Sequence, residues 1–463
     1  MQSCFLCIRY VDADKKIIRN FGVFEKVDDF VSDDGLFRIP NDQTPNEQSK
    51  FFYKPVNIAE EELDFSTIQK NFSDHLQGIL GMIIYGKMLP GLVASLRLNS
   101  IKDKHLKILS KNHDIREDCE ILEFDPHHLG GLTRKISKAH FEATSAAQFL
   151  RLMILGLVSQ FDAYMGRVLR LAIDDRPDIA MKSQKQFPAH EVFSFPDVES
   201  FKEAVTDREI EGFLRKSHAE QFDWISDTFN IKTKDGLERW PLFIETCERR
   251  NLFSHSNGVV SQNYIIKCAS AGLDDLPPRG AFLDVDEKYL YERTCVFLEI
   301  GVLVSQVISR KIDSSNENLE KMDEVLNHIG YDLILHGHFE VAKSILKFGC
   351  ALKRHGSAMM KSMMVINYAN AAKLAGDSDL SARILSEVDW SIYDAQFRIS
   401  ERAICNDVDS VISLMHEIGD SEKFPRKNYI EWPVFSHVQE NILFQEAYKE
   451  IFGEEYPILQ KSV

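Results

Sequence analysis

The segment Glu245–Gly258, ETCERRNLFSHSNG, joins the end of a predicted helix to a helix-stop signal. Within it, His255 follows Arg250 by five residues. On a helix that turns roughly 100° per residue, these two side chains would point about 140° apart, whereas Asn251 and His255 would be only about 40° apart. The Asn-Gly pair at 257–258 favours the left-handed backbone that ends helices, so we expect the helix to stop just after His255.

An arginine and a histidine at a helix end suit the cleavage of RNA by its own 2′-hydroxyl group. The unpaired carbonyls of the last turn favour a protonated imidazole, which can transfer protons near neutral pH. A guanidinium can bind the non-bridging phosphate oxygens and stabilise the charge that develops on them. No set of metal ligands accompanies the pair, so we expect a metal-free reaction and no cofactor. The alternative is that both side chains only complement the helix dipole, and spacing alone does not separate the two interpretations.

The surrounding residues carry a family resemblance. The Arg-Asn-x-x-x-His string in RRNLFSHSNG closely resembles the motif of the HEPN superfamily of helical ribonucleases. The segment GLVSQFDAYMGRVLRLAI at 156–173 resembles the first long helix of that fold, and YLYERTCVFLEIGVLVSQVI at 289–308 resembles a closing helix. Together these segments cover roughly residues 140–312.

The resemblance implies a site and an activity. Arg250 and His255 would be the catalytic pair, and Asn251 would help to orient them. Asp162, from the first helix, would contact the motif, and Arg249 would support it within a small basic patch that also holds Arg239 and Lys267. The family implies a homodimer whose two motifs form one composite site. The reaction needs one proton removed and another donated, and one histidine cannot easily do both, so the motif of the second chain would supply a second histidine. RNA would be cleaved to leave a 2′,3′-cyclic phosphate, in phage defence or as a toxin.

Composition sets limits on the partners and the location. The chain has 463 residues, a formal charge of −16 and 44% hydrophobic residues, which is typical of a globular protein of two to four units. The negative charge argues against binding nucleic acid over the whole surface, although a local RNA site is compatible with it. We expect a cytoplasmic protein without a membrane span, because no signal peptide or long uncharged apolar run is evident and the eight cysteines are scattered. Cys4 and Cys7, and the adjacent His127 and His128, are each too few to favour a metal site.

We expect a mainly α fold in three regions. Residues 1–138 read as an α+β region of unknown role, with a strand hairpin at its start, a loop at 29–58 and a helix at 65–86. Residues 139–313 are predicted to form a HEPN-like helical domain, whose first helix would begin at Thr144 or Ser145.

Residues 314–463 show a weak internal repeat and are predicted to be a tetratricopeptide-like helical region behind a polar linker, DSSNEN at 313–318. The segments at 331–346 and 370–385 resemble each other, with Gly337 and Gly376 in matching positions, and 401–415 is a fainter third copy. Such a region usually binds a protein partner or braces the neighbouring domain. The segment 432–453 would cap the array.

Two other functions stay open from the sequence. The chain could be a non-catalytic HEPN-type interaction or scaffold protein, in which Arg250 would be bonded to an acidic neighbour and His255 would be packed. It could also be the target of a partner nucleotidyltransferase, with Tyr264 as the nucleotide acceptor. Neither alternative requires RNA cleavage by this chain.

Overall fold

The protein divides into two compact units, Met1–Leu63 and Asp64–Val463. The computed structural model describes residues 5–13, 16–24, 64–101, 110–116, 119–124, a few positions between 134 and 141, 148–181, 186–234, 236–421 and 424–457. The expectations for the loop at 29–58 and for Cys4, His127, His128, Thr144 and Ser145 lie outside these described residues.

Two strand hairpins are described before residue 138. Strand β1 (Phe5–Ala13) pairs with the antiparallel β2 (Lys16–Phe24), from Phe5 opposite Phe24 to Ala13 opposite Lys16. Strand β3 (Ser110–Arg116) pairs with the antiparallel β4 (Cys119–Phe124). The first hairpin lies where the sequence pattern alternates, but the α+β character of residues 1–138 as a whole stays a prediction.

The described chain is otherwise helical, and its centre is a bundle around α5 (Phe149–Asp175) and α12 (Glu287–Ile312). The helices α8 (Val198–Leu214), α9 (His218–Phe229), α10 (Trp240–Ser256) and α11 (Gln262–Ser270) complete this part. Side-chain caps start several of them: Asp197, Ser217, Ser261 and Asp286 each accept a hydrogen bond from a backbone N–H of the first turn. The short helices α6 (Asp178–Met181) and α7 (Ala189–Val192) lie in the connection between α5 and α8.

Three phenylalanines from different helices meet at the centre of the bundle. Phe161 of α5 lies 5.0 Å from Phe243 of α10 and 5.3 Å from Phe297 of α12, measured between ring centroids, and all three are fully buried. Each buried ring removes a large apolar surface from water, so this contact fixes how α10 sits against α5. It therefore also fixes the positions of the polar residues that lie next to Phe161 and Phe243 in the chain.

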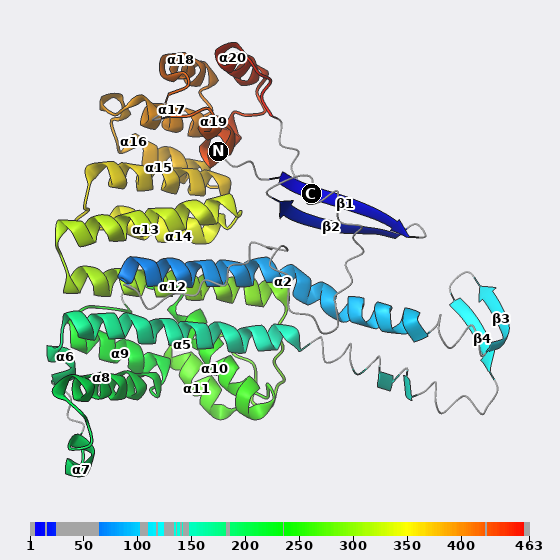
Figure 1. Ribbon diagram of the computed structural model, residues 1–463, viewed down its shortest axis with the longest axis vertical. Helices are drawn as coiled ribbons and strands as arrows, with labels where there is room; N and C mark the ends of the chain where they lie inside the picture. Colours follow the sequence, from blue (N-terminus) through cyan, green and yellow to red (C-terminus); the bar gives the residue numbers. More distant parts are fainter. Residues whose placement is uncertain are drawn as a thin grey trace. The chain divides into compact units, whose positions relative to one another are not determined.

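Helix α2 (Phe65–Ile101) belongs to this bundle, not to a separate N-terminal region as the boundary at 138 implied. It packs along α12 and α5 (Figure 1). Phe72 stacks on Tyr164 with 4.0 Å between ring centroids, and the Gln69 side chain donates a 2.9 Å hydrogen bond to the Val302 carbonyl. A side chain on Gly301 would come within 2.4 Å of the Phe72 ring, so a glycine is required at this helix crossing. The sequence pattern identified the helix, but only its partners show where it belongs.

The predicted linker at 313–318 is the beginning of the next helix. Ser315 caps α13 (Asn316–Leu335), and the Asn318 side chain donates a 2.7 Å hydrogen bond to the Asp313 carbonyl. Arg310 of α12 forms an ion pair with the fully buried Asp323 of α13 at 2.5 Å. The bundle and the repeat region are therefore continuous. The polar residues at 313–318 cap a helix and do not form a flexible linker.

The three sequence repeats are three helical hairpins, stacked one after another along the chain (Figure 1). They pair α13 with α14 (Phe339–Ala351), α15 (Ala358–Leu374) with α16 (Ser378–Ser386), and α17 (Ala395–Ile404) with α18 (Val408–Ile418). Gly337, Gly376 and Asn406 occupy the same position in the three turns, with φ of 78°, 91° and 59°. In each turn the following residue donates to the carbonyl five residues earlier, a bond that closes helix ends of this type.

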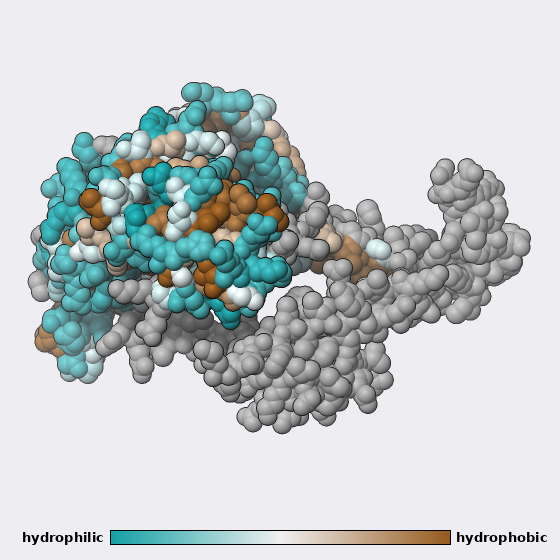
Figure 2. All heavy atoms as spheres, turned by 90° about the horizontal axis from the view of Figure 1, so that it is seen from above, coloured by the Kyte–Doolittle hydropathy of each residue, from teal (hydrophilic) through white to brown (hydrophobic). Residues whose placement is uncertain are grey.

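The end of the repeat region is covered by short helices. After the 3-10 turn η2 (Trp390–Ile392) and the third hairpin come α19 (Lys427–Glu431), η3 (Pro433–His437) and α20 (Ile442–Phe452), which pack on α17 and α18 around a common apolar core. Figure 2, which views the molecule from above, shows apolar surface among polar residues. Ile442 and Leu443, at the start of α20, are among the exposed apolar side chains.

Helix α5 is the one helix in the described part of the chain with the length and apolar composition of a membrane span. Half of its apolar window is buried, and the helices that pack on α5 are mainly α12, α2, α10 and α8. Burial of this kind is equally typical of a core helix, so the composition of α5 does not identify a membrane protein.

Candidate functional site

The motif helix α10 ends where the sequence predicts. Asn257 has a left-handed backbone with φ 46°, and its N–H donates to the Leu252 carbonyl. Gly258 has φ 82°, and a Cβ atom there would lie 2.8 Å from the Leu283 carbonyl oxygen. His255 is thus in the last turn, where it complements the free carbonyls of the helix end.

The carboxylate of Asp162 joins Arg250 to a second histidine. Its Oδ2 atom lies 3.4 Å from the Arg250 guanidinium, and its Oδ1 atom lies 3.0 Å from Nε2 of His218. Arg250 and Asp162 each expose 27% of their side chains, so solvent screens this pair only in part. The contact expected between α5 and the motif is therefore present, and it includes a residue that the sequence analysis did not name.

His218 is held firmly at the first position of α9. Ser217 and Glu220 form a capping box around it, and its side chain is only 8% exposed. The ring lies edge-on to Phe243 at 5.6 Å. The pattern Ser-x-x-Glu signals the helix start, but nothing local to His218 indicates a partner 56 residues earlier in the chain.

His255 does not join this cluster. Its side chain is exposed, and no hydrogen bond or ion pair connects it to another of the described residues. The Arg250 guanidinium instead faces Asp162 of α5, as the wide angle between the two side chains on the helix predicts. Within one chain, the structure gives no contact between the two residues proposed as the catalytic pair.

Asn251 has its own partner. Its Nδ2 atom donates a 3.4 Å hydrogen bond to Glu248, whose other carboxylate oxygen lies 2.9 Å from Lys267 Nζ. This chain of contacts links α10 to α11 and includes neither Arg250 nor His255. An orienting role of Asn251 therefore has no supporting contact in a single chain.

Arg249 is part of the structural core next to the motif. It donates a 2.7 Å hydrogen bond to the buried carboxylate of Glu245, which also accepts from the hydroxyls of Tyr264 at 2.8 Å and Tyr289 at 2.7 Å. Arg293 is a second cation beside this carboxylate, at 3.5 Å. A carboxylate that accepts three hydrogen bonds and lies beside a second cation binds α10, α11 and α12 together, so Arg249 supports the site by packing rather than by facing a substrate.

The buried position of Tyr264 argues against the alternative in which this residue is a nucleotide acceptor. The residue is 1% exposed, and its hydroxyl donates to Glu245. Burial and the neighbouring Glu245 carboxylate raise the pKa of this phenol well above its usual value. A hydroxyl that is enclosed, bonded and hard to deprotonate is a poor nucleophile for nucleotide transfer.

The expected basic patch is neutralised. All four of its cations have a carboxylate partner, and the pairs are Arg239–Glu299, Arg249–Glu245, Arg250–Asp162 and Lys267–Glu248. The sequence places the positive charges near the motif, but the acidic partners come from other turns and other helices. An RNA phosphate would have to share or replace these carboxylates.

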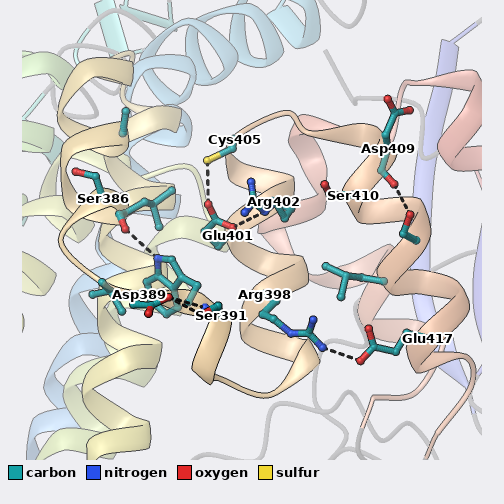
Figure 3. A pocket seen from close by; sticks show the side chains of 16 residues that line it. Ser386, Asp389, Ser391, Arg398, Glu401, Arg402, Cys405, Asp409, Ser410 and Glu417 are labelled. Carbon is teal, nitrogen blue, oxygen red and sulfur yellow. Dashed lines mark hydrogen bonds and ion pairs between the residues drawn. The ribbon is translucent and has the colours of Figure 1, made fainter.

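The described residues contain no group of three histidine, cysteine, aspartate or glutamate side chains arranged to hold a metal ion. Two cavities lie in the repeat region. One, of about 840 Å³, is lined by α16, α17 and α18 (Figure 3). Its arginines are already paired: Arg398 with Glu417, and Arg402 with Glu401. The second, of about 450 Å³, is lined by α13, α15, α17 and η3.

No family model, curated protein or solved structure matches this chain. The HEPN resemblance therefore rests on the residues of α5, α10 and α12 that carry it.

Proposed function

We propose that the chain is a metal-independent endoribonuclease of the HEPN type. The observation that carries the proposal is the exposed His255 at the C-terminal end of α10, five residues after an arginine that Asp162 holds from a neighbouring helix. Arg250 remains partly exposed, and its one contact to Asp162 is long and made through Nη2. Nε is buried, so a phosphate would bind the Nη atoms of the guanidinium.

In the proposed reaction, His255 transfers the protons and Arg250 stabilises charge on the phosphate. The 2′-oxygen attacks the phosphorus atom and loses its proton to a base, while the departing 5′-oxygen gains a proton from an acid. The products would be a 2′,3′-cyclic phosphate and a free 5′-hydroxyl. One histidine per chain serves one of these proton steps at a time, so a second copy across a twofold axis would supply the other.

An RNA cleavage assay tests this function directly. We expect the wild type to cut RNA in the presence of a metal chelator and to leave 2′,3′-cyclic phosphate ends. Arg250→Ala and His255→Ala should each reduce the rate by about 100-fold or more. His416→Ala is the matched control, because His416 is also exposed in the last turn of a helix, α18, outside the proposed site. Cleavage by His255→Ala at the wild-type rate would refute the proposal.

The proposed dimer is tested by mass. Light scattering of the purified protein should give twice the mass of one chain, and mixing Arg250→Ala with His255→Ala subunits should change the activity relative to either variant alone.

We place the enzyme in the cytoplasm and propose phage defence or toxicity as its role. Toxicity on expression should therefore disappear in the His255→Ala variant.

A non-catalytic interaction protein is the second candidate. The ion pair between Arg250 and Asp162, together with the neutralised basic patch, favours it, because a paired arginine needs no substrate to explain it. Under this function the helical bundle would dimerise and the repeat region would bind a protein partner. If the purified wild-type dimer leaves RNA intact under every condition in which it is folded, the result would support the interaction protein over the nuclease.

A further inference from the structure

The second cavity has the composition of a binding site for a small neutral ligand. It has a volume of about 450 Å³, within the range of roughly 300–1,000 Å³ that small-molecule pockets occupy. Its lining comes from the first helix of each of the three hairpins, α13, α15 and α17, and from the capping segment around η3. Since these helices are adjacent in the stack, the cavity is a product of the repeat architecture.

Aromatic side chains form part of the wall. Tyr331, Phe397 and Trp432 come from three different elements. Trp432 is held edge-on to Phe424 with 4.9 Å between centroids, and Phe397 is buried. Aromatic side chains in a cavity wall offer apolar surface on which another planar ring can stack.

Amide side chains form the polar part. The Asn367 Nδ2 atom donates a 2.9 Å hydrogen bond to Oδ1 of Asn327, which fixes how both amides are turned. This bond leaves Nδ2 of Asn327 as a donor and Oδ1 of Asn367 as an acceptor, and neither has another partner among the described residues. The Gln396 side-chain amide is also without a hydrogen bond to any described residue. Paired donors and acceptors on amides match the edges of nucleobases.

The lining excludes a strong phosphate site. No lysine, arginine, aspartate or glutamate is among the described residues that line the cavity. The one histidine in the lining, His328, already has Asp332 as its partner, with 3.2 Å between Nε2 and the carboxylate. A phosphate placed there would lose its hydration without gaining an unpaired opposite charge, which costs free energy. The preferred ligand is therefore an uncharged base or nucleoside, not a nucleotide.

We propose that this cavity binds a nucleoside, with its base between the aromatic side chains and its edge bonded to the Asn327–Asn367 pair. This site is separate from α10, so it would add a ligand-sensing function whether or not the chain cleaves RNA.

Titration calorimetry of the full-length protein tests the site, with adenosine, guanosine, cytidine and uridine as the probes. We expect at least one to bind with a dissociation constant below about 1 mM, and its 5′-monophosphate to bind no more tightly. Asn367→Leu keeps a similar side-chain size and should weaken binding by about tenfold or more, because one hydrogen bond is lost and Asn327 loses its partner. Ser413→Ala, in the wall of the other cavity, is the control and should bind as the wild type does.

A second readout is independent of the Asn367 substitution. A base stacked near Trp432 should change the tryptophan fluorescence of the wild type, and Trp432→Phe should remove that change while retaining the thermal unfolding midpoint. Absence of binding for all four nucleosides up to their solubility limits would overturn the proposal. Binding that Asn367→Leu leaves unaltered, or tighter binding of the monophosphate, would also overturn it.

Discussion

The carboxylate of Asp162 on α5 lies 3.4 Å from the guanidinium of Arg250 on α10, although 88 residues separate them in the chain. The same carboxylate binds the buried His218, so one acidic side chain positions a partly exposed arginine and a fixed histidine. The contact explains why Arg250 faces α5, while His255, further along the same helix, faces solvent. It also makes Asp162 the residue through which the site is most directly tested.

Asp162→Asn should impair the proposed RNA cleavage more than it impairs folding. We expect a loss of about 1 kcal/mol in the free energy of unfolding, because the charged contacts to His218 and Arg250 weaken. The rate of RNA cleavage should fall by more than the loss of folded protein explains, since Arg250 loses the contact that fixes its position. Asp174→Asn, at an exposed position on the same helix, is the control. RNA cleavage at the wild-type rate in Asp162→Asn would show that the contact is only structural.

Glu245→Gln should be among the most destabilising substitutions near the motif. The carboxylate is 4% exposed and is shared by Arg249, Arg293 and two tyrosine hydroxyls. Removing its charge leaves two enclosed guanidinium groups without their partner, which costs roughly 3–5 kcal/mol. Urea unfolding measures the loss, and Glu292→Gln on the exposed side of α12 should change stability little. A loss below about 1 kcal/mol would mean that Arg249 and Arg293 find other partners.

Gly337→Ala should destabilise the first repeat turn through its backbone alone. The residue has φ 78°, and a Cβ atom would meet nothing within 4 Å, so the cost is the left-handed conformation, about 1–2 kcal/mol. Asn406 occupies the equivalent position in the third repeat, and Asn406→Gly should be nearly neutral. The same Gly→Ala change at Gly156, in open space within α5, should stabilise by up to about 1 kcal/mol. Thermal unfolding of the three variants distinguishes these effects, and equal shifts for Gly337→Ala and Gly156→Ala would contradict the explanation.

Acid should destabilise the repeat region through His437. Burial, with a smaller contribution from Lys373, lowers the pKa of this histidine from 6.5 to about 4. Its Nε2 atom lies 2.8 Å from Asn370 Oδ1, so the neutral ring donates a hydrogen bond there. Because the folded-state pKa is the lower one, stability is fully present above pH 6.5 and declines as the pH falls toward 4. The loss attributable to this group is about 2 kcal/mol at pH 5.

The His437→Gln variant isolates this effect. Urea unfolding at pH 7 and pH 5 should show a smaller loss of stability for the variant than for the wild type, by about the same 2 kcal/mol. Identical losses in the two proteins would assign the acid sensitivity to other groups.

Particular residues show how far the sequence predicts the molecule. The stop at Asn257 and Gly258, the helices α8, α9, α10 and α12, and the turns at Gly337 and Gly376 follow from capping residues and local periodicity, because these depend on neighbours within about one helical turn. Helix α11 was not predicted. The helix at Phe65 was also predicted, but its place in the bundle was not. Packing of Phe72 on Tyr164 joins segments far apart in the chain, and no local pattern encodes that contact.

The sequence by itself determined a mainly helical chain, the position of Arg250 and His255 at a helix end, and the repeated turns at Gly337 and Gly376. Only the tertiary structure decided the electrostatics around them. It paired Arg239, Arg250 and Lys267 with carboxylates on other helices, brought His218 to the Asp162 carboxylate, enclosed Tyr264, and left His255 exposed. The physical reason is that helix formation is a local equilibrium, whereas the partner of a charge depends on which helices pack against each other.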